Sequence, residues 1–176
     1  LIPVLAGLLS GNGRELEMNA TGSRGAGATT ALLLLDEREK EFVFEDVPEP
    51  PVPSLLRDFS APVRLEFDYS PEQLAVLMAH DSNPFTRWEA GQELAKQAIL
   101  ENVKRRADGK DMELPPVLES AFRALLEDEG ADPALLAEAI SLPGEDYLAE
   151  LVDEVDVDGI HAARLFVKAR LAARLE

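Results

Sequence analysis

The segment Phe42–Tyr69, FVFEDVPEPPVPSLLRDFSAPVRLEFDY, decides the fold because it joins two stretches of different chemistry. Four prolines within Pro48–Pro53 exclude both a helix and a central strand at that point. Val63–Tyr69 then alternates apolar and charged residues, a pattern that predicts a half-buried strand. Beyond it the periodicity becomes helical. The sequence therefore predicts two domains, residues 1–69 and residues 70–176.

The residues before this segment are typical of strands and turns. Val4–Leu9 is a short apolar run, and the turn cluster Ser10–Gly13 joins it to Glu15–Met18, so that a hairpin is predicted. Asn19–Ala28 is rich in Gly, Ser and Thr and is expected to be a loop. Two further strands are predicted at Thr29–Leu35 and Glu41–Glu45.

The second part is expected to be entirely helical. Ser70-Pro71-Glu72-Gln73 combines an N-cap hydroxyl, a proline at the first helical position and a Gln that completes a capping box. Short helices that open on Pro suggest antiparallel helix pairs, as in an α-solenoid, although no fixed-period repeat supports this. Six helices are predicted. The first ends near His80, the second spans Pro84–Ala107, the third begins at Pro115-Pro116 and the fourth at Asp132-Pro133. The fifth spans Glu145–Val152, and the sixth begins at Asp158-Gly159.

Composition excludes several classes of function. The chain has 176 residues, a net charge of −17 and no cysteine. Such a charge disfavours nucleic acid and anionic membrane surfaces, because both are bound by clustered Lys and Arg. The lack of cysteine excludes disulfides and Cys-ligated zinc, and with no apolar membrane span it favours a cytoplasmic protein.

The run Val52–Val63, VPSLLRDFSAPV, resembles the sandwich-to-helix junction of the bacterial aminopeptidase N family, which are zinc metallopeptidases of the gluzincin type. Other blocks resemble the same family in the same order, so the resemblance covers essentially the whole chain. These blocks are Leu1–Val4, Thr30–Asp46, Asn83–Gln92 and Asp132–Pro143.

The resemblance implies a partial antiparallel Ig-like β-sandwich followed by the start of a helical domain. It also implies that the chain is an interior piece of a larger enzyme whose catalytic domain lies upstream. The family's zinc motif, H-E-x-x-H, is absent, since His80 is followed by Asp81 and His161 by Ala162. We therefore assign no catalytic, cofactor-binding or metal-binding residue, and expect zinc only in the parent enzyme.

The resemblance implies a non-catalytic role in an aminopeptidase that removes N-terminal residues from peptides. Residues 1–69 would act as a spacer, and residues 70–176 would form part of the cover over the catalytic chamber. The expected partner is the remainder of the parent chain, and a truncated sandwich edge invites self-association. The alternative is a helical interaction module with a β-sandwich adaptor and no enzymatic role.

Other motifs have ordinary structural explanations that we favour. Glu154–Gly159 is similar to a calcium loop but lacks the Glu that an EF-hand needs, so a helix N-cap is expected. His80 and His161 are expected to be surface or boundary residues. Trp88, one helical turn after Phe85, is expected to pack in the core.

The junction between the two domains is expected to be rigid. Apolar side chains there offer surface to bury, at on the order of 2 kcal/mol for each large side chain. They are Leu55, Leu56, Phe59, Val63 and Leu65.

Overall fold

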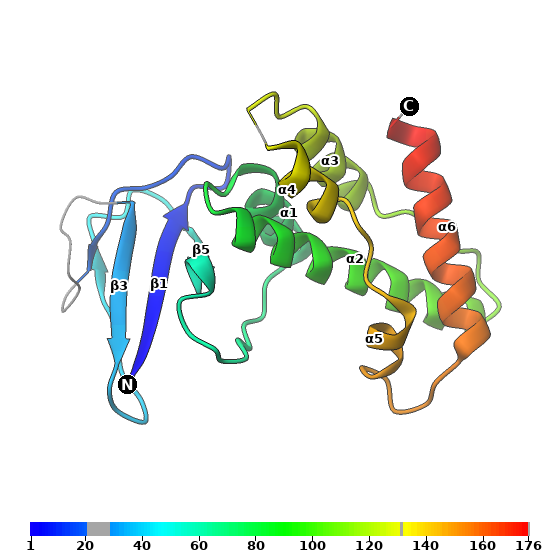
Figure 1. Cartoon of the computed structure of the whole chain (residues 1–176), viewed down its shortest axis with the longest axis horizontal. Coiled ribbons are helices and arrows are strands. Elements are labelled where there is room, and N and C mark those ends of the chain that lie inside the picture. Colours follow the sequence, from blue (N-terminus) through cyan, green and yellow to red (C-terminus); the bar gives the residue numbers. More distant parts are fainter. Residues whose placement is uncertain (21–28, 131, 176) are drawn as a thin grey trace. The chain divides into compact units, whose positions relative to one another are not determined.

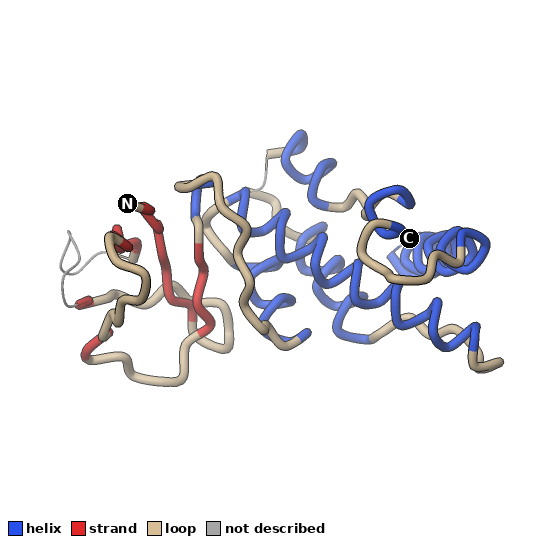
Figure 2. Tube along the Cα trace, turned by 90° about the horizontal axis from the view of Figure 1, so that it is seen from below, coloured by secondary structure: helices blue, strands red, loops and turns tan. Residues whose placement is uncertain are grey.

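The computed structural model describes residues 1–20, 29–130 and 132–175. The chain divides into two compact units, Leu1–Glu89 and Ala90–Glu176, and the division falls within one long helix. Among the described residues, strands (red in Figure 2) are confined to the first unit, and most of the helical residues belong to the second. The predicted order, an antiparallel sheet followed by helices, is therefore confirmed.

The first unit contains a three-stranded antiparallel sheet with β1 (Ile2–Leu9) at its centre. β3 (Thr30–Leu35) pairs with one side of β1 and β5 (Val52–Leu55) with the other (Figure 1). A second, two-stranded sheet joins β2 (Asn19–Ala20) to β4 (Phe44–Glu45). β1 thus receives both ladders of the main sheet, a position that was not predicted from the sequence.

Alternation along β1 and β3 places one set of side chains in a common core. Ala6 lies opposite Ala31 in the register of the two strands, and both are buried. Met18 and Leu16, from the stretch after the first turn, join the same cluster. This apolar cluster therefore lies on one face of the sheet.

The proline-rich stretch forms an edge strand. Pro53 lies within β5, which pairs only with β1 among the described strands. An edge position tolerates proline, because one side of the strand needs no N–H donor. The prolines exclude a central strand, as predicted, and the edge strand β5 was not expected from the sequence.

The predicted strand at Val63–Tyr69 is wrong. Within the described residues this stretch pairs with no strand, and most of its side chains are exposed, Arg64 and Glu66 by 82% each. Charged and apolar residues do alternate along this stretch, but the apolar side chains do not form a buried face. At the end of the stretch, the Tyr69 hydroxyl donates a hydrogen bond to the Pro53 carbonyl at 2.8 Å.

Other strand predictions are partly wrong. Glu15–Met18 forms no continuous strand, since Glu15 makes an isolated bridge with Leu9 and Met18 is a separate bridge residue, although the Ser10–Gly13 turn is present. The strand expected at Glu41–Glu45 is reduced to β4. In the stretch expected to be a loop, Asn19 and Ala20 form β2, and residues 21–28 lie outside the described residues.

The helices follow the predicted starts closely. Ser70 caps α1 through a complete capping box, in which its hydroxyl accepts from the Gln73 N–H and the Gln73 side chain accepts from the Ser70 N–H. Pro or acidic residues mark most of the other starts, as their dipole and steric preferences require. The helices are α1 Pro71–His80, α2 Pro84–Ala107, α3 Pro116–Leu126, α4 Pro133–Ala139, α5 Glu145–Ala149 and α6 Val157–Leu175.

The second unit is held together by the apolar stripes of its helices. α3 buries Leu118 and Leu125, and α6 buries Ile160 and Val167, at the spacing of one helical face. The buried Asn102 of α2 fixes the following loop by hydrogen bonds in both directions with the Glu113 backbone, at 2.8 and 2.7 Å. In the described part of the chain, none of the helices has both the length and the apolar character needed to cross a membrane.

Candidate functional site

The two histidines lie at unrelated surface positions. The ring of His80 covers the turn at Gly13, where an added Cβ would lie 2.3 Å from the ring carbon Cγ. His161 on α6 has its Nδ1 atom 3.0 Å from Oε1 of Glu145, in an exposed pair. Among the described residues, no group of three or more His, Cys, Asp or Glu side chains is arranged to hold a metal ion. That the chain has no metal or catalytic site stays a prediction.

The acidic stretch before α6 caps that helix. Asp156 Oδ1 accepts a hydrogen bond from the Gly159 N–H at 2.8 Å, and Oδ2 lies 3.5 Å from Arg106 Nη1. A side chain on Gly159 would collide with the same carboxylate, since its Cβ would lie 2.1 Å from Oδ2. The stretch therefore behaves as the expected cap.

A buried cluster around Arg57 is the most highly organised polar site in the described part of the first unit. Arg57 follows β5, and its side chain is almost completely buried. Nη2 lies 2.8 Å from Glu15 Oε1 and 3.2 Å from Asp81 Oδ1. Nε donates to the Ser54 hydroxyl at 2.8 Å, and Nη1 donates to the Thr30 hydroxyl at 2.7 Å. We call Arg57, Glu15, Ser54, Thr30 and Asp81 the Arg57 cluster.

Gly7 makes room for the guanidinium. A Cβ at this central position of β1 would lie 2.1 Å from Arg57 Cζ and 2.3 Å from Nη2. No side chain fits there while the arginine keeps its place. Gly7 is therefore part of the site by virtue of its missing side chain.

The surroundings shift the pKa values of the two carboxylates of the cluster in opposite directions. Burial would raise the pKa of Glu15, but hydrogen bonds from Arg57 and Ser82 outweigh it and hold the pKa below its usual 4.5. Burial raises the pKa of Asp81 above its usual 3.8, despite hydrogen bonds from Ser54 and the Asn83 N–H and the charge of Arg57. One Asp81 oxygen, Oδ2, has no hydrogen-bond partner among the described residues.

The backbone around Arg57 adopts an unfavourable conformation. Leu56, Asp58 and Phe59 all have left-handed φ values, of 57°, 55° and 51°. Such a conformation costs a residue other than glycine about 1 kcal/mol or more. Asn83 holds this backbone in place through both ends of its side-chain amide. Asn83 Nδ2 donates to Asp58 Oδ1 at 2.6 Å, and Asn83 Oδ1 accepts from the Asp58 N–H at 3.3 Å. The Arg57 cluster and Asn83 thus bind the segment after β5 to the residues that follow α1.

The same strained segment presents an aromatic side chain to solvent. Phe59 is 56% exposed, and its ring lies edge-on to Phe85, with centroids 5.4 Å apart. Trp88 continues the row at 6.0 Å from Phe85 and is 38% exposed, so the prediction that it packs in the core is wrong. The buried face of α2 lies elsewhere on that helix, along residues such as Leu94 and Ile99. We call Phe59, Phe85 and Trp88 the aromatic row.

The residues that were predicted to pack at the junction differ in how far they are buried. Leu56 is buried, and Leu55 and Leu65 are half-buried, whereas Phe59 and Val63 are exposed. At the end of β5 the ion pairs of Arg57 therefore add to the apolar packing of Leu55 and Leu56. Arg57 was missed as a site residue, and the available signal was a single cation embedded in the apolar run around Leu56 and Phe59.

The Arg57 cluster has the character of a structural clamp. Every nitrogen of the guanidinium has a partner, so its donors are taken up within the cluster. Arginine suits this position because its planar fork binds several acceptors at once and stays charged when buried.

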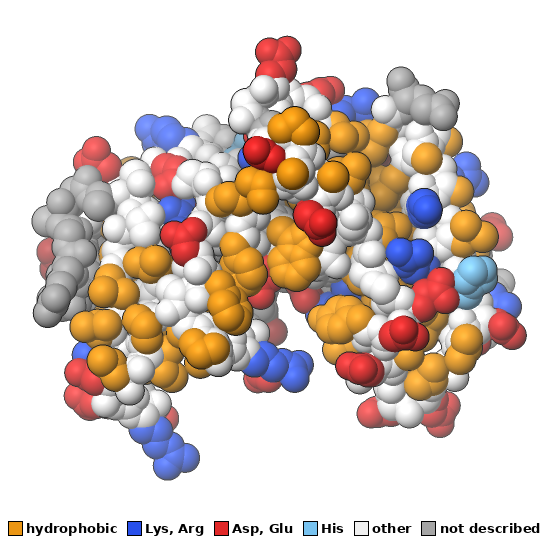
Figure 3. Space-filling view, in the orientation of Figure 1, with side chains coloured by type: hydrophobic (Ala, Val, Ile, Leu, Met, Phe, Trp, Pro, Cys, Tyr) orange, Lys and Arg blue, Asp and Glu red, His pale blue; other side chains and the backbone are white. Residues whose placement is uncertain are grey.

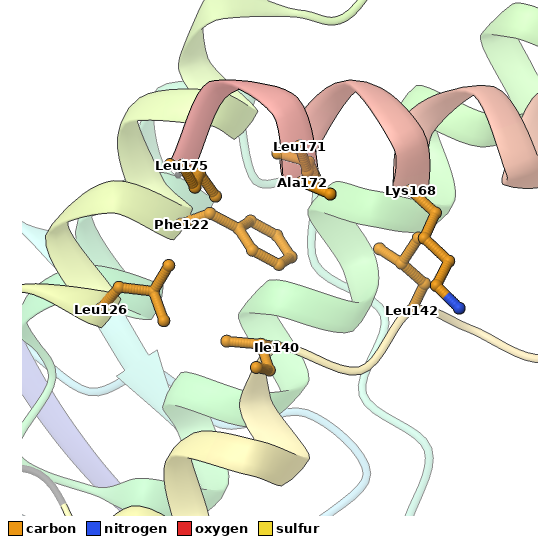
Figure 4. Close-up of a pocket in the computed structure, with 8 residues that line it drawn as sticks. All are labelled: Phe122, Leu126, Ile140, Leu142, Lys168, Leu171, Ala172 and Leu175. Atoms are coloured by element: carbon orange, nitrogen blue, oxygen red, sulfur yellow. The ribbon is translucent and has the colours of Figure 1, made fainter.

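The second unit carries an apolar groove between α3, the end of α4 and α6. Its cavity measures about 320 Å³ (Figure 4). Buried side chains form its floor and more exposed ones its rim, and on the face drawn in Figure 3 apolar side chains gather between α4 and α6. We define the α3–α6 groove by Phe122 and Leu171 on the floor and by Leu126, Ile140, Lys168 and Ala172 on the rim.

Two protein families match successive stretches of the chain. Residues 71–176 match the family described as a domain of unknown function (DUF3458_C) with ARM repeats, and residues 1–68 match the family described as DUF3458 with an Ig-like fold. ARM repeats are stacked helix pairs, so the prediction of a solenoid-like helical part and an Ig-like sandwich is confirmed.

Individual proteins from three bacteria also match almost the whole chain. The chain is 39% identical to aminopeptidase N of Escherichia coli (strain K12) over 174 residues, which are 99% of this chain and 20% of that protein. It is 35% identical to aminopeptidase N of Haemophilus influenzae over 175 residues, with the same two coverages, and 37% identical to that of Caulobacter vibrioides over 169 residues, 96% of this chain and 18% of that protein.

A solved structure shows the same fold. The crystal structure of Legionella pneumophila aminopeptidase A in complex with aspartic acid matches with a TM-score of 0.79 and 36% identity, over 99% of this chain and 19% of that one. The chain thus spans about a fifth of the length of the relatives it matches. The chain belongs to the aminopeptidase N family, in which it corresponds to the Ig-like and ARM-repeat domains.

Proposed function

We propose that this chain is a non-catalytic segment of an aminopeptidase that removes N-terminal residues from peptides. Residues 1–69 act as a spacer, and residues 70–176 form part of the cover over the catalytic chamber. The observation that carries the proposal is the match of almost the whole chain to three proteins named aminopeptidase N. The parent enzyme is proposed to be cytoplasmic and to use zinc.

The described residues do not fit the zinc that the family implies. A zinc site of this type needs two His ligands one helical turn apart, a carboxylate ligand and a general-base Glu. His80 and His161 belong to different compact units and each lies beside unrelated groups. The proposed zinc therefore belongs to the rest of the parent chain, and no catalytic step is assigned to the residues of this chain.

The Arg57 cluster supports the spacer role. A spacer has to keep a fixed geometry, and a buried charge cluster with several hydrogen bonds specifies one arrangement where plain apolar contact allows sliding. The strained backbone from Leu56 to Phe59 points the same way, because strain persists only where the surroundings hold it in place. The aromatic row and the α3–α6 groove offer apolar surface suited to contact with the remainder of the parent chain.

The first test uses the purified chain beside the full-length parent enzyme. Zinc content by mass spectrometry and hydrolysis of an alanine anilide are measured for both. We expect zinc and turnover in the parent and neither in the chain. Stoichiometric zinc with turnover in the chain alone would refute the proposal.

The spacer and cover roles need a second test in the parent. Arg57→Met is expected to loosen the Arg57 cluster, so that the parent still cleaves alanine anilide but discriminates less against a folded protein with an N-terminal alanine. Arg64→Met, at an exposed position, is the matched control. Unchanged discrimination in a parent whose first unit is measurably loosened would argue against these roles.

The alternative is a helical interaction module with a β-sandwich adaptor, which acts by binding alone. The exposed aromatic row is the observation in its favour, because exposed aromatic side chains are enriched at protein interfaces. The coding sequence separates the two proposals. An H-E-x-x-H motif upstream in the same reading frame supports the enzyme, and its absence supports the module.

A further inference from the structure

We infer that the α3–α6 groove is the seat of an amphipathic helix from the remainder of the parent chain, with an acidic side chain of that helix beside Lys168. This inference rests on the proposed function and names a contact surface and its partner.

The lining of the groove has the spacing of a helix-binding surface. On α6, the lining residues Leu171, Ala172 and Leu175 lie three, four and seven positions after Lys168. Such a row forms a ridge along one side of a helix, into whose grooves a second helix packs. Figure 4 shows the Phe122 ring directed into the space between this row and Ile140.

The chemistry of the lining favours a helix over a small molecule. At about 320 Å³ the cavity lies near the lower end of the range for ligand pockets, about 300–1,000 Å³. Small-molecule sites combine apolar walls with several convergent polar groups. Here seven of the eight lining residues are apolar, and the remaining one is Lys168. The continuous apolar face of a helix would be complementary to such a surface.

Lys168 supplies the element of charge complementarity. Its side chain is exposed at the rim, and within the described residues it has no ion-pair partner. An Asp or Glu on the flank of the docked helix would pair with this ammonium, as flanking charges do in paired helices. The contact would fix which way round the helix lies.

The fold of the second unit points to the same occupant. ARM repeats stack helix pairs, so that each pair buries its apolar face against a neighbour. A second copy of this chain is a poorer partner, because two copies at a net charge of −17 each repel one another. An anionic lipid surface is disfavoured for the same reason.

The test uses two neighbouring alanines of α6 that are both exposed. Ala172 lies at the rim of the groove, and Ala173 does not line it. Since the chain contains no cysteine, Ala172→Cys and Ala173→Cys each place a single thiol in it. The maleimide labelling rate of each thiol is measured in the chain alone and in the full-length parent, with labelled peptides identified by mass spectrometry and rates normalised to the denatured protein.

We expect both thiols to react rapidly in the chain alone. In the parent, labelling at Ala172→Cys should slow on the order of tenfold or more relative to Ala173→Cys, because it requires local opening of the docked helix. Lys168→Glu should then restore part of the labelling at Ala172→Cys, while Lys110→Glu, at an exposed position after the end of α2, should not. In a parent that retains activity on alanine anilide, these results are independent of the first test.

Three outcomes would overturn the inference. Equal, rapid labelling of both thiols in an active parent would show that the groove is open. Equal protection of both would show that the whole end of α6 is enclosed without a seat at the groove. Protection of Ala172→Cys in the chain alone, together with a dimer by light scattering, would identify a second copy as the occupant.

Discussion

Arg57 Nη2 lies 2.8 Å from Glu15 Oε1, although the two residues are 42 positions apart in the sequence. This ion pair joins the segment that follows β5 to the stretch after the first turn, and Asp81 adds a contact from the end of α1. With Thr30 of β3, three other segments of the chain therefore converge on one buried guanidinium. The stability of the first unit should depend on that convergence.

Arg57→Met should strongly destabilise the first unit. Removing one partner of a buried ion pair leaves uncompensated charge and typically costs about 3–5 kcal/mol. Trp88 is the only tryptophan of the chain and lies in this unit, so its fluorescence during urea unfolding reports on the unit directly. Arg64→Met, at an exposed pair, should change the unfolding free energy by less than about 1 kcal/mol. Equal effects of the two substitutions would contradict the structural role of Arg57.

Gly7→Ala should destabilise the same unit by displacing the guanidinium. The added methyl group would lie 2.1 Å from Arg57 Cζ, and overpacking of this kind costs about 1–3 kcal/mol or more. Gly11→Ala is the matched control, because its Cβ would meet no described atom within 4 Å. In the Arg57→Met background the cost of Gly7→Ala should fall, since the clash is then relieved. Strictly additive effects would show that the two positions do not interact.

Asp81→Asn should alter the pH dependence of stability. Because burial raises the Asp81 pKa in the folded state, this carboxyl favours folding most at low pH, and its contribution declines as pH rises above about 3.8 through the raised value. The unfolding free energy of Asp81→Asn should therefore improve relative to the unmodified chain as pH rises through this window.

Glu15→Gln provides the control of opposite sign. The folded pKa of Glu15 lies below 4.5, so its contribution is present above that pH and is lost as pH falls through the lowered value. The stability difference between the unmodified chain and Glu15→Gln should shrink on acidification. Parallel pH profiles for the two variants would contradict the assigned environments.

Ser70→Ala should weaken the start of α1. The substitution removes the hydroxyl that accepts from the Gln73 N–H at 3.2 Å, and the loss of an N-cap typically costs about 1 kcal/mol. Ser70→Thr keeps an acceptor oxygen at that position and should retain most of the stability. Urea unfolding followed by Trp88 fluorescence measures both, and a loss in Ser70→Thr as large as in Ser70→Ala would argue against the cap.

Local signals predicted the helices well and the sheet less well. Capping residues such as Ser70 and Asp132 act on backbone groups a few positions away, so the sequence nearby contains the necessary information. Val63–Tyr69 shows the limit of such reasoning. Its alternation is a local property, but a strand also needs a partner edge, and the structure provides none there among the described residues.

By itself, the sequence determined that the chain has a strand-rich part and a helical part, where most helices begin, and which family it resembles. These properties follow from short-range periodicity, caps and motif order. Only the tertiary structure decided that Arg57 is buried among Glu15, Ser54, Thr30 and Asp81, that Gly7 leaves space for it, and that Trp88 is exposed. The physical reason is that these features depend on contacts between residues far apart in the sequence, whose energies no local pattern encodes.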